Sequence, residues 1–248
     1  GRYGLGMVFL PTDDKQRDEC QQIIASVVQQ EGHTLLGWRD VPVSPDAIGT
    51  LSARVMPVIR QFVVANGDEA DDQFRFEQRL FVIRKQIERL IGESDLEDKD
   101  DFYICSLSTN KVVYKGLIMA HQLEGFYHDL ADEDVVTSFA LVHSRFSTNT
   151  LGTWKLAHPY RFVVHNGEIN TVRGNTNWMA AREKNFVSSL LGDDIKKILP
   201  VTTPDQSDTA TLDNALEILL GSERSLEHSM MMLIPEAWGD HIPMDKAK

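Results

Sequence analysis

The sequence has 248 residues, of which 42% are hydrophobic and 25% are charged. This composition is that of an ordinary globular protein and excludes a wholly disordered or fibrous chain. The formal net charge of −12 gives no electrostatic footprint for nucleic acid or for an anionic membrane surface. No apolar run approaches the ~18 residues that a membrane-spanning helix needs. We therefore expect neither nucleic acid nor a membrane among its partners.

The first third of the sequence alternates strand-like and helix-like patterns. Residues 5–10 form an apolar run typical of a strand, and the following apolar positions repeat at helical spacing until Gly32. Residues 34–38 and 58–65 are further predicted strands. Between Asp71 and Gly92 the apolar positions advance in steps of three and four, which predicts a long amphipathic helix.

The rest of the chain is predicted to be rich in strands and to end in helices. The acidic run 93–101 is interpreted as a solvated connector. Residues 102–107 and 112–117 flank a short polar loop, which indicates a hairpin, and residues 138–143 and 161–165 are further candidate strands. Residues 175–186 are predicted to be helical. A last helix around residues 212–219 is one that Ser207 or Asp208 could cap and Gly221 could end.

Two cysteines, Cys20 and Cys105, are too few and too far apart for a disulfide framework, and no zinc-type spacing of Cys and His occurs. A reducing compartment is therefore expected. No signal peptide is recognisable at the N-terminus. The sequence opens at Gly1 and runs directly into a strand, so we expect that a preceding segment is missing.

Polar residues are concentrated in three clusters, at 143–150, 157–171 and 204–209. Together they resemble the class II glutamine amidotransferases, specifically the amidotransferase domain of glutamate synthase large chains. Segments outside the clusters also resemble that family, namely 37–42, 102–108, 114–116, 174–178 and 235–238. Other class II amidotransferases share mainly the three clusters.

The resemblance implies an α/β (α+β) fold of the N-terminal-nucleophile hydrolase type, a four-layer αββα sandwich. Residues 1–248 would form a single amidotransferase domain that is incomplete at both ends. The predicted order of helices early, strands in the middle and helices late suits such a layered architecture. The order of the strands does not follow from the sequence.

Asn166 and Gly167 are the candidate oxyanion hole. An Asn-Gly pair alone is most often a turn, but here Glu-Ile-Asn-Thr follows it. Amide hydrolysis passes through a tetrahedral oxyanion, which a side-chain amide and a backbone N–H can stabilise. The resemblance assigns these two donors to Asn166 and Gly167.

Three residues are candidate ligands of the substrate glutamine. By the resemblance, Arg145 holds the α-carboxylate, which a guanidinium can bind through two parallel hydrogen bonds. Thr148 resembles a second contact to the same group. Asp208 matches the residue that binds the α-ammonium group, although an Asp at this place can also be a helix N-cap.

Three histidines, His143, His158 and His165, fall in the polar clusters without the spacing of a metal-ligand set. We therefore predict no metal site. The resemblance gives all three supporting roles, those of His158 and His165 through hydrogen bonds, and a purely structural histidine is the alternative for both of these.

The nucleophile of the family is a cysteine at the mature N-terminus, whose α-amino group acts as the base. This sequence has Gly1 there. Cys20 and Cys105 lie on an apolar helix face and in a predicted strand, so both are interpreted as small core residues. The 248-residue chain alone is accordingly predicted to lack glutaminase activity.

The resemblance implies an enzyme of nitrogen metabolism, a glutamate synthase located in the cytoplasm, or in the plastid of a plant or alga. It hydrolyses L-glutamine and passes the ammonia to 2-oxoglutarate, using FMN and a 3Fe-4S iron–sulfur cluster whose sites lie outside these residues. Its partners are the rest of the large chain and an NAD(P)H-oxidising small subunit. Two alternatives stay open, an amidotransferase that feeds a sugar phosphate and a non-catalytic glutamine-binding module.

Overall fold

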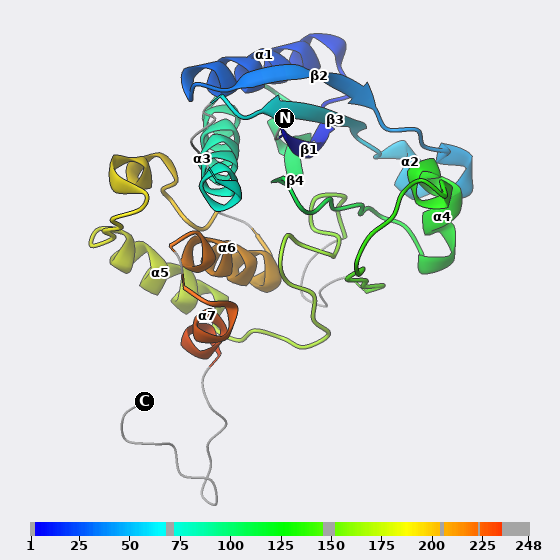
Figure 1. Cartoon of the computed structure of the whole chain (residues 1–248). Helices are drawn as coiled ribbons and strands as arrows, with labels where there is room; N and C mark the ends of the chain where they lie inside the picture. The colour runs from blue at the N-terminus through cyan, green and yellow to red at the C-terminus, as the bar shows by residue number, and fades with distance from the viewer. Residues whose placement is uncertain (1–2, 68–71, 146–151, 204–205, 223, 235–248) are drawn as a thin grey trace, which may run out of the picture.

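The computed structural model describes residues 3–67, 72–145, 152–203, 206–222 and 224–234. Its strands are β1 (Tyr3–Leu10), β2 (Thr34–Asp40), β3 (Val58–Ala65) and β4 (Tyr103–Ser108). Its α-helices are α1 (Asp14–Gln30), α2 (Thr50–Arg54), α3 (Gln73–Gly92), α4 (Leu123–Phe126), α5 (Val172–Glu183), α6 (Asp208–Gly221) and α7 (Leu226–Leu233) (Figure 1). Short 3₁₀ turns occupy Pro45–Ala47, Lys99–Asp101, Ala120–Gln122, His128–Ala131 and Gly192–Lys197.

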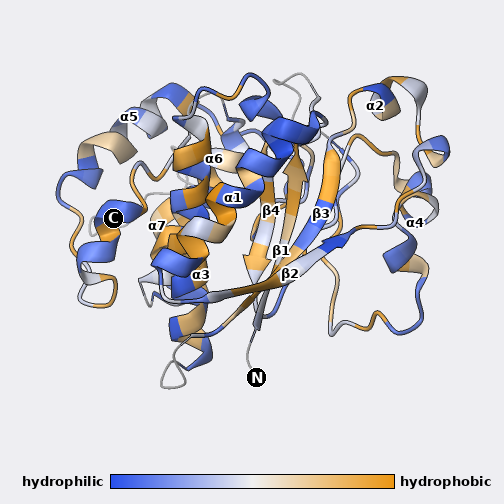
Figure 2. Cartoon of the chain, turned by 90° about the horizontal axis from the view of Figure 1, so that it is seen from above, coloured by the Kyte–Doolittle hydropathy of each residue, from blue (hydrophilic) through white to orange (hydrophobic). Residues whose placement is uncertain are grey.

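The four strands form one antiparallel sheet in the order β2-β3-β1-β4. Helices α1 and α3 lie on one side of it, and α2 and α4 lie on the other side (Figure 2). Alternate residues of β1 divide between the two faces, as the two-residue period of a strand requires. Val8 and Leu10 join the core under α1 and α3, whereas Met7 and Phe9 join a second core with Phe126 and Trp154.

Close approach of helix α3 to the sheet depends on a glycine in β1. A Cβ atom on Gly4 would lie 2.4 Å from Cδ1 of Leu80 in α3. A side chain larger than hydrogen fits there only if the Leu80 side chain moves. On the face covered by α1 and α3, Leu80 therefore packs directly against the backbone of β1 at Gly4.

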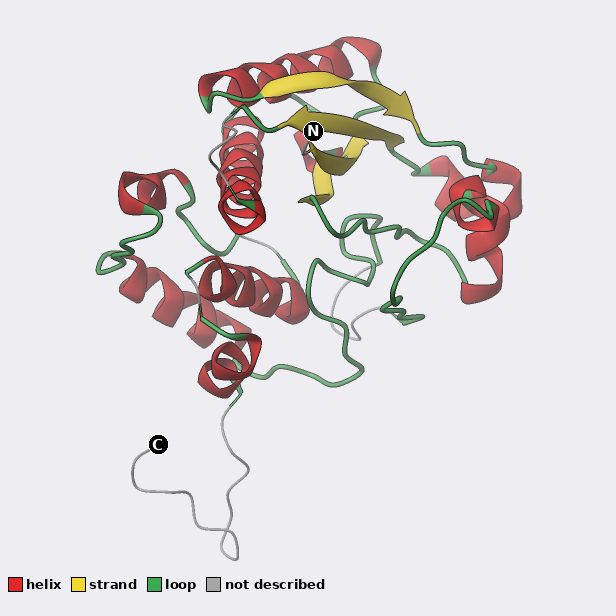
Figure 3. Cartoon of the chain, in the orientation of Figure 1, coloured by secondary structure: helices red, strands yellow, loops and turns green. Residues whose placement is uncertain are grey.

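The segment between β4 and α5 is mostly loop (Figure 3). The expected strands at 112–117, 138–143 and 161–165 are wrong for this structure, in which none of the three is a strand. Instead of pairing in a hairpin, Val113 N–H donates to Oγ of Ser106 at 3.1 Å. A strand needs a backbone partner, and within the described residues the only sheet is β2-β3-β1-β4, so strand propensity alone did not suffice.

The four predicted helices are present as α1, α3, α5 and α6 and differ from the predictions only at their ends, whereas α2, α4 and α7 were not predicted. Helix α3 begins at Gln73, two residues after the expected start, where the carboxylate of Asp72 accepts from the N–H of Arg75 at 2.8 Å as the N-cap. Helix α5 begins and ends three residues earlier than predicted. Within the described residues, none of the helices is both long and apolar enough to cross a bilayer.

Candidate functional site

Three histidines from two separate loops meet below the N-terminus of α6. The ring centroids of His143 and His158 are 4.2 Å apart, and those of His158 and His165 are 6.1 Å apart. A ring nitrogen of His143, Nε2, lies 2.9 Å from the backbone oxygen of His165. The structure thus brings together the three histidines that the sequence analysis singled out.

The first residues of helix α6 bind the loop that follows His165. Oγ1 of Thr209 lies 2.7 Å from Nε2 of His165, and the N–H of Ile169 donates to Oδ2 of Asp208 at 2.9 Å. Ser207 caps the helix by accepting from the N–H of Ala210. The alternative that Asp208 is the N-cap is therefore wrong, because Ser207 holds that position and Asp208 is left to face the loop.

Asp208 is buried and negatively charged. Burial acts to raise the pKa of Asp208, but the N–H groups of Ile169 and Thr209 that donate to its oxygens lower that pKa below the usual value. A carboxylate that stays ionised is what a ligand for an ammonium group must be.

Asn166 and Gly167 form an exposed bend between His165 and Ile169, both of which are held by α6. The nearest atom to a Cβ placed on Gly167 would be Nδ1 of His165, at 3.5 Å. Backbone N–H groups in such an exposed bend can donate to a ligand.

Arg145 is exposed, and its backbone N–H donates to Nδ1 of His143 at 3.1 Å. Because His143 also contacts the backbone of His165, Arg145 belongs to the same neighbourhood as Asn166. Thr148, the other predicted carboxylate ligand, lies outside the described residues.

His158 is the central ring of the histidine cluster. Burial, followed by the neighbouring His143 and His165, lowers its pKa to about 4. Among the described residues neither ring nitrogen of His158 has a hydrogen-bond partner. A neutral ring therefore packs against Tyr160, with the ring centroids 5.1 Å apart.

Both cysteines are buried and chemically inert. Burial raises the pKa of Cys20 to about 11 and that of Cys105 to about 12. A thiol attacks only as a thiolate, so neither cysteine can act as the nucleophile near neutral pH. Across the described part of the chain, no group of three or more His, Cys, Asp or Glu side chains could hold a metal ion.

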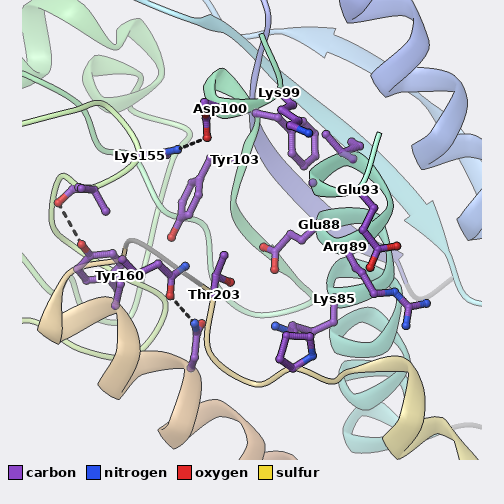
Figure 4. Close-up of a pocket in the computed structure, with 18 of the residues that line it drawn as sticks. Lys85, Glu88, Arg89, Glu93, Lys99, Asp100, Tyr103, Lys155, Tyr160 and Thr203 are labelled. Atoms are coloured by element: carbon purple, nitrogen blue, oxygen red, sulfur yellow. Dashed lines mark hydrogen bonds and ion pairs between the residues drawn. The ribbon is translucent and has the colours of Figure 1, made fainter. Parts of the chain in front are cut away.

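A cavity of about 510 Å³ lies beside the candidate site, between α3 and α6 (Figure 4). The ion pair between Lys155 and Asp100, at 3.2 Å, lies at its wall. None of the predicted site residues lines it, although Tyr160 and Arg161 do and precede His165 in the same loop.

The sequence analysis missed two residues that organise this region. Thr209 was not singled out, although a hydroxyl beside Asp208 at a helix start is a typical contact residue. Asp213 was not singled out either, yet it is fully buried and binds backbone N–H groups of the loop. A carboxylate among the apolar positions of a helix was the available signal.

Comparison with known proteins places the whole chain in one family. The model of the class II glutamine amidotransferases matches residues 1–248. The chain is 48% identical over 247 residues to the glutamate synthase [NADPH] large chain of Bacillus subtilis (strain 168), covering 100% of this chain and 16% of that protein. It is 43% identical over 235 residues to the ferredoxin-dependent glutamate synthase of Pyropia yezoensis, which covers 95% of this chain and 15% of that protein.

A chloroplastic relative extends this comparison to land plants. The ferredoxin-dependent glutamate synthase 2 of Arabidopsis thaliana is 42% identical over 240 residues, which cover 96% of this chain and 14% of that protein. The chain thus spans only 14–16% of the length of these relatives.

Proposed function

Because the chain belongs to the class II glutamine amidotransferases, we propose that it is the glutamine-hydrolysing part of a glutamate synthase. The observation that carries this proposal is the match of the whole chain to glutamate synthase large chains. In the proposed reaction, L-glutamine is hydrolysed to glutamate and ammonia, and the ammonia passes to 2-oxoglutarate.

Each end of the substrate has a proposed ligand. Arg145 binds the α-carboxylate with Thr148 beside it, and the ionised Asp208 binds the α-ammonium group. The anionic state of Asp208 and its place beside the loop support this assignment. The side-chain amide of Asn166 and the backbone N–H of Gly167 then face the developing oxyanion of the γ-amide. His143 and His165 hold these loops together through hydrogen bonds, and His158 packs between their rings.

The nucleophilic cysteine is proposed to come from a part of the larger protein outside these 248 residues. Support comes from the burial and raised pKa of both thiols present. The thiolate attacks the γ-carbonyl carbon, ammonia leaves with the proton that the α-amino group returns, and water then hydrolyses the thioester to glutamate.

The complete domain is proposed to be the four-layer αββα sandwich of N-terminal-nucleophile hydrolases. The apolar segment around residues 135–142 supports a second sheet, since the side chains of Val136, Phe139 and Val142 are 74–86% exposed. Large apolar side chains in an extended run are typical of a strand that lacks its neighbours. Segments beyond these residues would supply those neighbours.

The redox groups of the full enzyme, FMN and a 3Fe-4S cluster, are proposed to bind elsewhere in the large chain. Iron–sulfur clusters are held by several cysteine thiolates, and two buried cysteines do not fit that requirement. The electron donor reaches the enzyme through another domain or an NAD(P)H-oxidising subunit. The proposed location is the cytoplasm, or the plastid if the source is a plant or alga.

The test uses steady-state glutaminase kinetics of the full-length enzyme with two variants. Asn166→Ala should lower kcat by about 10²- to 10³-fold, because one oxyanion donor is worth about 2.7–4 kcal/mol in the transition state. Arg145→Lys should mainly raise KM, because the point charge of lysine lacks the paired hydrogen bonds of the guanidinium.

Three results would contradict the proposal. An Asn166→Ala variant with raised KM and unchanged kcat would refute the oxyanion role. Glutamine binding without turnover in the unaltered full-length protein would indicate a binding module. Transfer of ammonia to a sugar phosphate instead of 2-oxoglutarate would assign a different acceptor.

A further inference from the structure

Asp213 of helix α6 binds three consecutive backbone N–H groups. Its Oδ1 accepts from Phe162 at 2.8 Å and from Val163 at 3.1 Å, and its Oδ2 accepts from Arg161 at 3.3 Å. The side chain is fully buried. The three N–H groups belong to neither a helix nor a strand, so this carboxylate supplies what a neighbouring strand would otherwise provide.

Arg161 ties the same carboxylate to the rest of the fold. Its Nη1 lies 3.7 Å from Oδ2 of Asp213, while its Nη2 donates to Glu88 of α3 at 2.9 Å and to the carbonyl oxygen of Ile104 in β4 at 2.6 Å. Burial raises the pKa of Asp213, and the cation of Arg161 opposes that rise. The loop is thus fixed to α6, α3 and the sheet at one residue.

Helix α6 holds the candidate oxyanion loop on both sides of its bend. Asp213 binds residues 161–163 before the bend, and Thr209 and Asp208 bind His165 and Ile169 around it. Only two residues separate Val163 from Asn166. Residues 161–163 therefore fix the chain on the side of the bend that leads into Asn166, and Thr209 and Asp208 fix the other contacts of the bend.

We propose that Asp213 is a positioning residue that sets Asn166 and Gly167 at the distance from Asp208 that the reaction requires. This inference rests on the proposed function. The ligand of Asp208 is one end of glutamine and the oxyanion forms at the other end, so the separation between the two must match the length of the substrate. Asp213 and Asp208 lie on one rigid helix, which makes α6 the common support for both.

The chain offers a matched control on the same helix. Glu217 lies one turn beyond Asp213 and pairs with Arg84 of α3, which also binds Glu88. In the described part of the chain, its carboxylate accepts no hydrogen bond from residues 161–169. Loss of Glu217 therefore disturbs the buried charges without releasing the loop.

The experiment compares Asp213→Asn with Glu217→Gln in the full-length enzyme. Asn preserves one acceptor but places an NH₂ group against the N–H and guanidinium of Arg161. Asp213→Asn should lower kcat for glutamine hydrolysis by about 10- to 100-fold, since small misplacements cost that much, with KM changed by less than about twofold. Glu217→Gln should leave kcat and KM within about twofold of the unaltered enzyme.

The inference would be overturned if Asp213→Asn and Glu217→Gln lowered kcat equally, or if Asp213→Asn left kcat unchanged. Asn166→Ala, measured in parallel, distinguishes failure of the positioning role of Asp213 from failure of the proposed oxyanion role of Asn166. If Asn166→Ala abolishes turnover while Asp213→Asn does not, only the positioning role fails. If Asn166→Ala retains its kcat, the proposed oxyanion role fails and the positioning role fails with it.

Hydrogen exchange in the unaltered full-length enzyme tests the inference even if Asp213→Asn does not fold. The amides of Phe162 and Val163 should exchange at least about tenfold more slowly than that of Gly167, because only the first two are bound to a buried carboxylate. Exchange at the same rate at all three amides would overturn the inference.

Discussion

The sheet region, residues 3–108, and the loop region, residues 109–171, are held by different means. In the sheet region, backbone groups pair with one another along four strands and within α1 and α3. In the loop region, isolated turns pair some backbone groups, and buried side chains bind others. Nζ of Lys115 donates to the carbonyl oxygen of Lys155 at 2.7 Å, and Oη of Tyr127 donates to that of Lys115 at 2.7 Å.

Both regions also bury ionisable side chains. The sheet region buries His33, Arg84 and Lys85 beside its apolar cores. The loop region buries Lys115, His158 and Arg161. Apolar burial depends little on pH, whereas a buried ionisable group makes stability depend on pH. Both regions should therefore contribute to the pH dependence of stability, the loop region through Lys115 and the sheet region through Lys85, whose pKa burial lowers to about 8.

The largest effect is expected from truncating a core residue of the sheet region. Phe62 is fully buried, and Phe62→Ala should lower the free energy of unfolding by about 3–5 kcal/mol. Phe139 of the loop region is 78% exposed, so Phe139→Ala should change it by less than about 0.5 kcal/mol. Urea unfolding followed by circular dichroism measures both, and a similar loss in the two variants would contradict the comparison.

A smaller, pH-dependent effect is expected at Lys115. Burial, with the cation of Arg161 acting in the same direction, lowers the pKa of Lys115 to about 7. Above pH 7 the folded state has lost a proton that the unfolded state keeps until near pH 10.5, so the free energy of unfolding rises with pH in this window. Between pH 7 and pH 8.5 the gain should be about 1–2 kcal/mol.

Lys115→Met should remove the part of the rise that Lys115 contributes, because methionine fills a similar volume without a titrating group. A smaller rise should remain from Lys85, whose pKa burial lowers to about 8. The window ends near pH 8.5, above which the buried thiols act in the opposite direction, since the pKa values of Cys20 and Cys105 are raised on folding. Urea unfolding curves of the unaltered protein and of Lys115→Met at pH 7.0 and pH 8.5 test this. An identical rise in the free energy of unfolding in the two proteins would show that Lys115 does not cause it.

The smallest expected difference in the free energy of unfolding is between variants of two helix caps, one near each region. Ser207 caps α6 and also lies 2.8 Å from Oη of Tyr160 in the loop region, whereas Asp13 caps only α1. Asp13→Ala should cost about 1 kcal/mol of unfolding free energy. Ser207→Ala should cost more by about 0.5–1.5 kcal/mol, the contribution of the additional hydrogen bond. Equal losses would mean that the bond to Tyr160 contributes nothing.

The same difference between regions explains how much the sequence could predict. The strand expected at 58–65 is confirmed as β3, and the expected helix ending at Gly92 is confirmed as α3. Both contain long apolar patterns with a single period, and local spacing suffices to recognise them. The strands expected at 112–117, 138–143 and 161–165 are wrong here, since pairing depends on partners that local spacing does not reveal.

The candidate site shows a similar division. The residue types around Asn166 and Asp208 were visible in the sequence because the motifs are compact. The contacts of Asp213 were not visible, because they join residues about 50 positions apart and bind backbone groups, whose identity the sequence does not encode.

Gly4 in β1 is linked through helix α3 to the loop that carries Arg161. Leu80 occupies the space that a Cβ at position 4 would need, and the same helix carries Glu88, the partner of Arg161. A methyl group added at residue 4 would push on the Leu80 side chain of the helix that anchors a loop more than 150 residues later in the chain. A genetic screen should therefore recover suppressors of Gly4→Ala at position 80, where a smaller residue restores the spacing.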